Sequence, residues 1–315
     1  MTRIAVIGMG TWGRQLIRVF DGLGDVVVAC NRGGAAGHEW LRTTYPDIRA
    51  GSSAADALDD ESVEAIVIAT SIPGHAPLAV TALERGKHVF VEKPLATSAV
   101  EGEKVVAAAR AANRTLFVGH TFLFDAAFEA LRQITAADPV EHIELSWLKY
   151  GTFREPLVWN LLPHEVALAT WLVGRPPALS VVERASGQTA LDRLVLDLDF
   201  GPGGPTGSIE IDRLHDHKVK TARVRLRSGD ELRWQDGNLA RIAGGQVVER
   251  LVEHSEEALV REARAFLEAV AGAGHGRSDG RFGTEVVRVI EPIAAALESA
   301  TALEPAAATS PETAR

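Results

Sequence analysis

A glycine pattern near the amino terminus limits the possible folds of this chain more than any other feature. Gly8, Gly10 and Gly13 follow an apolar, strand-like segment, residues 4–7, and a helical segment comes directly after them. Glycines permit a tight turn and close approach of the backbone to a pyrophosphate, and the start of the helix offers N–H donors to it. We therefore predict a dinucleotide-binding unit; the alternative is a glycine-rich turn in some other α/β protein. The loop residues expected at the cofactor are Gly8, Gly10, Thr11, Trp12 and Gly13.

The second strand-like segment, residues 26–30, ends where a nucleotide-binding unit usually carries an acid for the ribose 2′-hydroxyl of NAD. Asn31 and Arg32 stand there instead. No carboxylate repels a 2′-phosphate, and a guanidinium can pair with that phosphate and stack on adenine. We predict that NADP(H) is favoured over NAD(H); the alternative is that Arg32 is a solvated surface residue.

Strands and helices continue to alternate as far as residue 120. An apolar strand, residues 65–69, is followed by a loop that should face the cofactor, because ligands bind at the carboxyl ends of strands in open α/β sheets. This order predicts a doubly wound parallel sheet with right-handed crossovers, the α/β Rossmann arrangement. The further residues expected near the cofactor are Thr70, Ser71, Pro73, His75, Glu92, Lys93 and His120.

The segment from Lys87 to Leu95 joins a strand to reactive groups. An apolar run of strand type is followed at once by Glu92, Lys93 and Pro94. Proline favours an extended conformation at the residue before it, so Lys93 is presented at the carboxyl end of a buried strand. Its amine can donate to a carbonyl or hydroxyl group, and its pKa should fall beside a cationic nicotinamide and away from water. The plainer interpretation is a Glu–Lys pair that caps the strand.

The second half of the chain has strands in series. A strand at residues 142–150 and a helix that runs to Val173 precede six strand-like segments between residues 179 and 252. Such a series predicts an α+β domain, a large, mostly antiparallel sheet with helices on one face and the other face open. The predicted divisions are 1–120 for nucleotide binding, 121–303 for substrate binding and oligomerisation, and 304–315 as a disordered tail.

Composition excludes several classes of protein. The net charge of −9 argues against general binding to nucleic acid or to an anionic membrane. The chain has no signal-peptide pattern and no apolar run of about 18 residues, so no membrane span is expected. The single cysteine, Cys30, precludes an internal disulfide and fits a cytoplasmic protein. His215 and His217 lie two residues apart, but no third ligand is evident, so no metal site is predicted.

Several motifs occur in a fixed order. They are the glycine loop, Ala69-Thr70 with His75, Gly86-Lys87-His88-Val89 running into Glu92-Lys93-Pro94, and Gly119-His120-Thr121-Phe122. Together they resemble the Gfo/Idh/MocA oxidoreductases, named for glucose–fructose oxidoreductase, inositol dehydrogenase and a rhizopine catabolism protein. The resemblance covers nearly the whole chain. It implies reversible hydride transfer between NAD(P) and a carbinol or ketone, usually of a sugar or cyclitol. It also implies a homo-dimer or homo-tetramer joined through the open face of the second sheet.

Residues 159–168 resemble the family's Trp-Asp-Leu-x-Pro-His-Asp-Leu segment. The resemblance makes His164 the proton donor and acceptor for the substrate oxygen, and imidazole titrates in a range that suits both directions. Asn160 stands where the family has an acid; its amide can hydrogen-bond substrate but cannot act as a base. Ala167 stands where some members carry another acid. Residue type alone favours a structural histidine at the start of a helix; the resemblance is what favours a catalytic role for His164.

Other candidate contacts have weaker support. Tyr150 and Arg154, like Lys149, precede Asn160 and are candidates to hold substrate hydroxyls or a phosphate, although each taken singly fits a solvated surface. His120 either contacts the nicotinamide end of the cofactor or braces the junction between the domains.

The residues, together with what the resemblance implies, predict an NADP(H)-dependent oxidoreductase, a dehydrogenase or ketoreductase of a sugar, nucleotide sugar or cyclitol-like molecule. Lys93 would orient the substrate oxygen, His164 would exchange the proton, and Asn160 would position the substrate. One alternative is a reductase of C=N bonds, because a reactive imine already carries its proton. The other is a catalytically silent NAD(P)-binding sensor, suggested by the lack of an acid at both Asn160 and Ala167.

Overall fold

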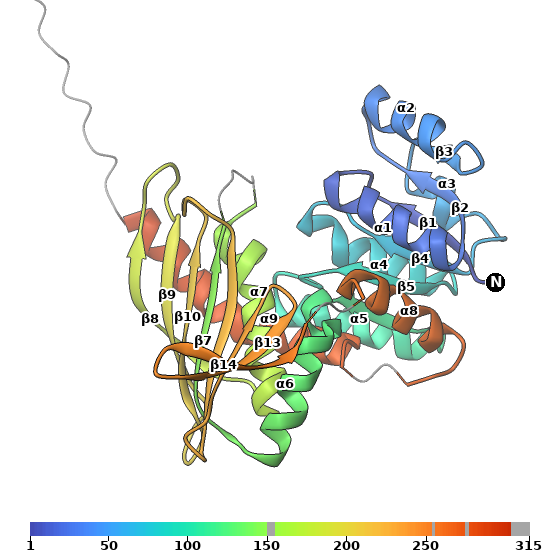
Figure 1. The fold of residues 1–315 in the computed structure, drawn as a ribbon. Coiled ribbons are helices and arrows are strands. Elements are labelled where there is room, and N and C mark those ends of the chain that lie inside the picture. Colours follow the sequence, from blue (N-terminus) through green and yellow to red (C-terminus); the bar gives the residue numbers. More distant parts are fainter. Residues whose placement is uncertain (150–154, 254–255, 275–276, 304–315) are drawn as a thin grey trace, which may run out of the picture.

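The computed structural model describes residues 1–149, 155–253, 256–274 and 277–303 of the 315-residue chain. Figure 1 shows two lobes, each built on its own sheet. Two of the predicted substrate contacts, Tyr150 and Arg154, lie outside the described residues.

The amino-terminal lobe contains a parallel sheet of six strands in the order β3-β2-β1-β4-β5-β6. Its strands are apolar along their length because both faces are covered. This is the predicted doubly wound arrangement. The strands are β1 (Arg3–Ile7), β2 (Asp25–Cys30), β3 (Arg49–Gly51), β4 (Ala65–Ile68), β5 (His88–Glu92) and β6 (Leu116–Gly119). The helices are α1 (Thr11–Leu23), α2 (Ala35–Thr44), α3 (Ala55–Leu58), α4 (His75–Glu84) and α5 (Ala99–Ala112), with short 3-10 turns η1 (Ile72–Gly74) and η2 (Thr121–Phe124).

The second lobe contains eight strands in the order β14-β13-β12-β11-β7-β10-β9-β8. Only the pair β7 and β10 is parallel, so the predicted, mostly antiparallel sheet is confirmed. Helix α7 covers one face, and the residues on the other face are more exposed. The strands are β7 (Val140–Leu148), β8 (Ala178–Ala185), β9 (Arg193–Asp199), β10 (Thr206–Asp212), β11 (Val219–Leu226), β12 (Glu231–Gln235), β13 (Asn238–Ala243) and β14 (Gln246–Val252). The helices are α6 (Ala126–Ala137), α7 (Leu157–Val173), α8 (Ala258–Val270) and α9 (Gly280–Leu303).

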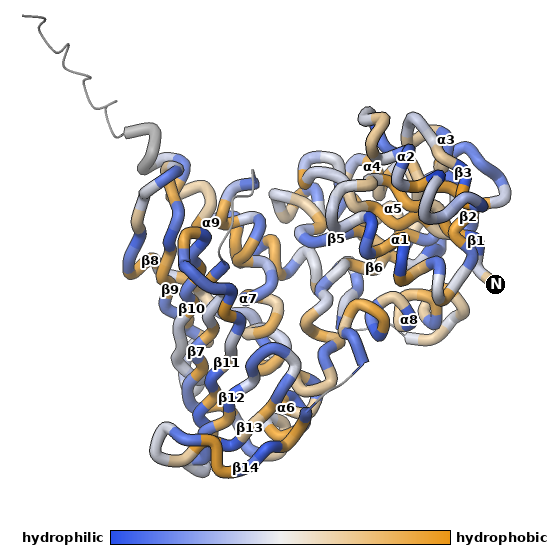
Figure 2. The backbone as a smooth tube through the Cα atoms, turned by 45° about the horizontal axis from the view of Figure 1, so that its top comes forward, coloured by the Kyte–Doolittle hydropathy of each residue, from blue (hydrophilic) through white to orange (hydrophobic). Residues whose placement is uncertain are grey.

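Figure 2 shows how the hydropathy of the two sheets differs: the first is covered on both faces and the second on one. The first sheet is mostly hydrophobic, whereas strands of the second sheet alternate between hydrophobic and hydrophilic residues. Within the described residues no helix is both long enough and apolar enough to cross a membrane.

One α-helix and two strands of the described residues were not predicted from the sequence: α2, β3 and β13. Strand β13 had a signal, because Asp236 and Gly237 both have positive φ and form the two-residue turn of the β12–β13 hairpin. An Asp-Gly pair between strand-like runs is a strong hairpin pattern.

The carboxyl-terminal helices return to the amino-terminal lobe. Helix α8 packs on α1 and η2, and α9 packs on both α5 and α7. Phe266 of α8 is fully buried in an aromatic cluster, with its ring 5.9 Å from that of Phe20, 5.7 Å from Phe90 and 5.8 Å from Phe117. The segment before α9 lies beside β6, where Ser278 exchanges hydrogen bonds with the backbone of Val118. The last part of the chain therefore helps to hold the first sheet.

Candidate functional site

The three glycines of the loop are required for different reasons. Gly8 has a φ of +109°, and a Cβ added there would lie 2.3 Å from the carbonyl oxygen of Ala69. A Cβ at Gly13 would lie 1.9 Å from the carbonyl oxygen of Gly8. A Cβ at Gly10 would meet nothing within 4 Å. The fold needs Gly8 and Gly13, whereas Gly10 keeps open a space at the start of α1 that a pyrophosphate can enter. The loop therefore fits a dinucleotide.

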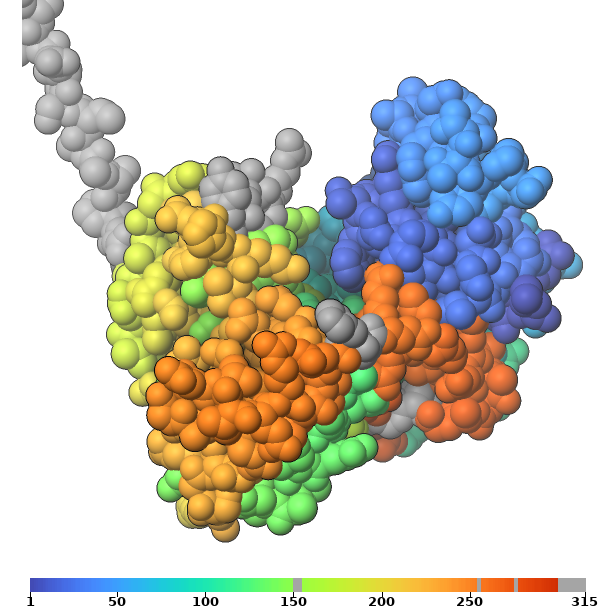
Figure 3. All heavy atoms as spheres, viewed as in Figure 1, coloured from blue at the N-terminus to red at the C-terminus, as the bar shows by residue number. Residues whose placement is uncertain are grey.

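A cavity of about 820 Å³ adjoins this loop and lies between the two sheets. Its walls include Lys149 and Glu155 from the second lobe, and Figure 3 shows a hollow between the amino-terminal lobe and the second lobe. Nine residues predicted at the cofactor line it: Gly8, Gly10, Thr11, Trp12, Gly13, Asn31, Arg32, Thr70 and Ser71.

The end of β2 forms one wall of this cavity. Asn31 donates from its side-chain amide to the carbonyl oxygen of Gly33 at 2.8 Å, which shapes a turn with positive φ at Gly33 and Gly34. Arg32 is exposed at the cavity. Neither of the two residues that follow β2 is an acid, as the sequence indicated.

The loop after β4 is tied to the end of β5 by His75. Its Nδ1 lies 2.8 Å from the carbonyl oxygen of Pro94, and its Nε2 lies 3.0 Å from that of Thr70. Burial lowers the pKa of His75, which is 2% exposed. Both ring nitrogens are thus engaged with the protein itself, and His75 joins two loops at the cavity. Pro73 lies in the exposed turn η1.

Glu92 is buried at the end of β5. Its Oε1 accepts from Nε1 of Trp12 at 2.5 Å, and its Oε2 accepts from the backbone N–H of Lys93 at 3.3 Å. Burial raises the pKa of Glu92 to about 7, against the opposing charge of Lys93 and the bond from Trp12. Glu92 therefore links the glycine loop to the strand that presents Lys93.

A second buried carboxyl, Glu262 of α8, was not predicted. It accepts from the hydroxyl of Thr121 at 2.8 Å. Burial, together with the nearby Glu92, raises the pKa of Glu262 well above its usual range. The sequence signal was an acid on the apolar face of an amphipathic helix, where Leu259, Ala263 and Phe266 are also buried.

Lys93 reaches from the first lobe to the second. Its Nζ donates to the backbone carbonyl oxygen of Asn160 in α7 at 2.9 Å. Burial lowers the pKa of Lys93 to about 8; the charge of Glu92 opposes this shift and the charge of Lys149 adds to it. Lys93 thus contacts Asn160 through the backbone of that residue, whereas the sequence suggested a role for the side chain.

His164 lies one turn after Asn160 and packs against two aromatic rings. Its ring centroid is 4.3 Å from that of Trp147 and 5.2 Å from that of Phe122. Burial lowers the pKa of His164 well below its usual value, and the charge of Lys93 is the next largest cause. The imidazole is therefore neutral near pH 7, a state that can accept a proton.

His120 is deeply buried at the junction of the lobes, 2% exposed, and packs edge-on against Phe282 of α9 at 5.6 Å. Burial and the charge of Lys93 lower its pKa to about 3. Within the described residues neither ring nitrogen has a hydrogen-bond partner. This contact with Phe282 of α9 is of the kind that a histidine bracing the junction between the domains would make.

A buried ion pair beside His164 was also missed. Lys220 of β11 bonds Glu165 of α7, and the two are 1% and 0% exposed. The sequence did carry a signal. Lys220 occupies an inward position of a strand whose other inward residues are apolar, and Glu165 interrupts an apolar helix.

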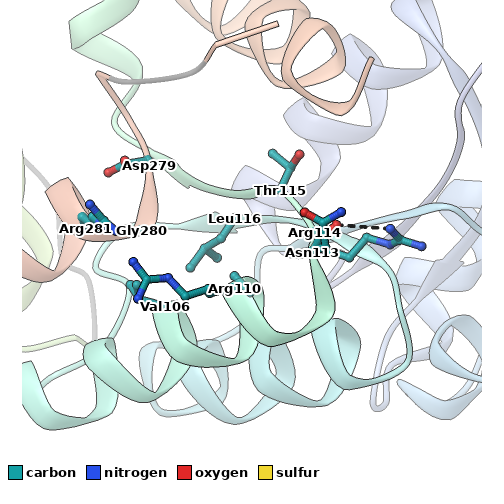
Figure 4. A pocket seen from close by; sticks show the side chains of 10 residues that line it. Val106, Arg110, Asn113, Arg114, Thr115, Leu116, Asp279, Gly280 and Arg281 are labelled. Carbon is teal, nitrogen blue, oxygen red and sulfur yellow. Dashed lines mark hydrogen bonds between the residues drawn. The ribbon is translucent and has the colours of Figure 1, made fainter. Parts of the chain in front are cut away.

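A further groove, of about 350 Å³, lies at the opposite end of the first sheet. Figure 4 shows Arg110, Arg114 and Arg281 around it, near Leu116 at the amino end of β6. Ligands of doubly wound sheets bind at the carboxyl ends of strands, so the chemistry belongs to the cavity at the glycine loop.

The arrangement can hold a dinucleotide along the glycine loop. Lys93 and His164 are not among the residues that line the cavity, but both interact electrostatically with Lys149, which does line it. Lys93 can donate a hydrogen bond to a substrate oxygen, and His164 can exchange a proton. Within the described residues no cluster of three potential ligands that could hold a metal ion is present.

Known proteins resemble this chain in sequence and in fold. Residues 2–120 match the family described as "Oxidoreductase family, NAD-binding Rossmann fold", GFO_IDH_MocA. The chain is 24% identical over 299 residues to the uncharacterized oxidoreductase YdgJ of Escherichia coli (strain K12), over 82% of this chain and 85% of that protein. It is 31% identical over 192 residues to an inositol 2-dehydrogenase of Leifsonia xyli subsp. xyli, over 56% of this chain and 55% of that one.

A solved structure of similar fold is UDP-N-acetylglucosamine 3-dehydrogenase GnnA from Acidithiobacillus ferrooxidans. Its TM-score is 0.85 at 20% identity, over 95% of this chain and 99% of that one. The family match falls on the lobe that carries the glycine loop and Lys93, so residues 2–120 are similar to the NAD-binding Rossmann domain of the Gfo/Idh/MocA oxidoreductases.

Proposed function

We propose that this protein is an NADP(H)-dependent oxidoreductase that interconverts a hydroxyl and a ketone on a sugar, nucleotide sugar or cyclitol-like molecule. The observation that carries the proposal is the bond between Lys93 Nζ and the carbonyl oxygen of Asn160. This bond joins the amine of Lys93, which follows strand β5, to helix α7, which carries His164.

The bound nicotinamide supplies or removes the hydride. Lys93 donates to the substrate oxygen, and a pKa of about 8 lets it share the proton with His164. His164 takes the proton of a hydroxyl during oxidation and returns one during reduction. Asn160 positions the substrate by hydrogen bonding, since an amide cannot ionise.

The preference for NADP(H) rests on Asn31 and Arg32. Arg32 is exposed beside the glycine loop and can pair with a 2′-phosphate, and neither residue that directly follows β2 is an acid. The substrate class rests on the relatives, because both an inositol 2-dehydrogenase and a UDP-N-acetylglucosamine 3-dehydrogenase resemble this chain.

We also propose that the chain forms a homo-dimer or homo-tetramer through the open face of the second sheet. Arginine–carboxylate pairs cross that face, as between Arg193 and Glu210 and between Arg225 and Glu141. Valines at its edges are exposed, including Val182 and Val248. Light scattering of the purified chain tests this, and a monomer at micromolar concentration would contradict it.

The test of function begins with binding. NADPH and NADH are titrated side by side in thermal shift; a ligand that binds only the folded chain at about 100 times its Kd stabilises it by about 2.7 kcal/mol. We expect NADPH to bind more tightly, and Arg32→Ala to remove that difference while NADH binding persists. Equal binding of both cofactors by the parent chain contradicts the NADP(H) preference.

Turnover is then measured with a panel of ketosugars, cyclitols and imines. His164→Ala should lower kcat by about 10²–10⁴-fold with the Kd for NADPH unchanged. His88→Gln is the matched control, because His88 lies at the other end of β5. Turnover of imines alone would support the C=N alternative, and cofactor binding without any turnover would support the sensor.

A further inference from the structure

Lysine is rare in this chain and is concentrated at the candidate site. Lysine and arginine together number 33, but only six are lysines. Lys87 bonds backbone carbonyls in the first lobe, and Lys104 lies on α5. The other four influence one another electrostatically in pairs: Lys93 with Lys149, Lys93 with Lys220, and Lys149 with Lys218. Lysine, unlike arginine, offers a compact ammonium whose proton can be lost when buried.

Lys220 is the most buried member of this group. Its ammonium bonds Glu165 and lies 4.1 Å from the ring centroid of Trp147 and 4.7 Å from that of Phe122. A cation over an aromatic face is attracted to it, and the attraction is stronger away from water. Lys220 is thus held by one carboxylate and two rings.

The same two rings hold His164. Its imidazole packs on Trp147 and Phe122, and Glu165 is the next residue along α7. In the sheet, Lys220 pairs directly with Trp147. The ion pair and the imidazole therefore contact the same two rings, and Glu165 is joined to His164 by a peptide bond. Displacing the ion pair should therefore displace the imidazole.

Charged and titratable groups face His164 from several elements. Lys93 stands at the end of β5, His120 follows β6, Lys149 follows β7, and Lys220 comes from β11. Burial and these groups together lower the pKa of His164. Glu165, on α7 itself, balances the charge of Lys220.

We propose that Lys220 and Glu165 are a positioning pair for His164, which fixes the imidazole against its aromatic rings and sets how readily it takes up a proton. This rests on the proposed function for the acid–base role of His164. Neither Lys220 nor Glu165 needs to touch the substrate.

Removing each partner should have opposite electrostatic consequences. Lys220→Met removes a repelling cation and leaves Glu165 unbalanced, which favours the imidazolium. Glu165→Gln removes the anion and leaves the cation, which favours the neutral ring. If Lys220 and Glu165 had a purely structural role, both variants would be less stable, but they would not change the protonation of His164 in opposite directions.

The experiment is an NMR titration of the imidazole in the full chain between about pH 5 and about pH 8, with the signal assigned through His164→Gln. We expect His164 to stay neutral in the parent and in Glu165→Gln, and its pKa to rise by about one unit or more in Lys220→Met. On any substrate found, the acidic limb of kcat/KM should move by the same amount, about tenfold at fixed pH. Lys87→Met, another buried lysine, should lower Tm but leave the titration as in the parent.

Because the removal of one partner of a buried pair is strongly destabilising, a double variant, Lys220→Met with Glu165→Leu, replaces both by apolar groups. The pKa of His164 in this double variant should lie between its pKa in the parent and its pKa in Lys220→Met. An unchanged titration in Lys220→Met or in the double variant, or a rise in Glu165→Gln, overturns the proposal. The titration needs no substrate, so its failure is distinct from a failure to find turnover.

Discussion

Gly8 and Gly10 differ sharply at the scale of single residues. Gly8→Ala would force a positive φ on alanine and drive its Cβ against Ala69, so it should lower Tm by several degrees. Gly10→Ala places its Cβ in open space, so Tm should stay near that of the parent while the Kd for NADPH rises by about tenfold or more. Thermal unfolding and fluorescence titration measure the two effects. Normal NADPH binding by Gly10→Ala would show that the pyrophosphate does not approach this glycine.

Glu92 makes stability depend on pH. Burial raises its pKa to about 7, so the folded chain holds the proton more tightly than the unfolded chain does. Stability contributed by this group is full below about pH 4 and is lost as pH rises through about 7. Glu92→Gln should flatten the profile of Tm against pH across that window, by about 3 kcal/mol in stability. Parallel profiles for the parent and Glu92→Gln would contradict this; the exposed Glu61→Gln should match the parent.

At the scale of elements, helix α7 carries both Asn160 and His164 around an internal proline. Pro163 has no N–H to donate to the carbonyl oxygen of Trp159, so the hydrogen-bond ladder is interrupted at the turn where Lys93 bonds Asn160. The interruption is a cost to the helix, and its position at the site suggests that it shapes the site.

Replacing this proline should therefore separate stability from activity. Pro163→Ala restores a donor and improves helix propensity, so Tm should equal or exceed that of the parent. Turnover should fall by about tenfold to about a hundredfold, because small displacements of catalytic groups are costly. Pro292→Ala in α9 is the control and should leave turnover unchanged. A Pro163→Ala variant of full activity would show that the interruption has no functional role.

At the scale of the whole molecule, the first sheet depends on the end of the chain. Phe266 joins the aromatic cluster of Phe20, Phe90 and Phe117, and Ser278 bonds the backbone beside β6. A fragment of residues 1–120 would expose these surfaces. Residues 1–120 contain all six strands of the first sheet but lack the carboxyl-terminal helices α8 and α9 that pack on this lobe.

We predict that residues 1–120 alone show no cooperative thermal unfolding. Loss of a buried phenylalanine alone typically costs about 3–5 kcal/mol, a large share of the stability of a small domain. Joining residues 258–303 to the fragment through a Gly/Ser linker should restore a cooperative transition and NADPH binding. Circular dichroism during heating measures both. Cooperative unfolding of the short fragment would contradict the prediction.

Local patterns allowed much of this protein to be predicted from sequence. The glycine loop, the apolar strands of the parallel sheet and the alternation in the second sheet depend on residues within a few positions of one another. The position of Lys93 at the end of a strand was predicted from the proline after it. His164 was chosen as a candidate because its segment resembles that of the family.

The contacts that complete the site join residues far apart in the chain, and no local periodicity encodes which of them meet. Lys93 and Asn160 are 67 residues apart, Lys220 and Glu165 are 55 apart, and Thr121 and Glu262 are 141 apart. Burial lowers the pKa of Lys93 and His164 and raises that of Glu92, and these groups are buried only in the folded chain. The sequence by itself determined the alternation of strands and helices in the first lobe, the cofactor loop and the residue types at the site. The tertiary structure alone decided which charges are paired, because pairing and desolvation depend on distances between segments that only the folded chain brings together.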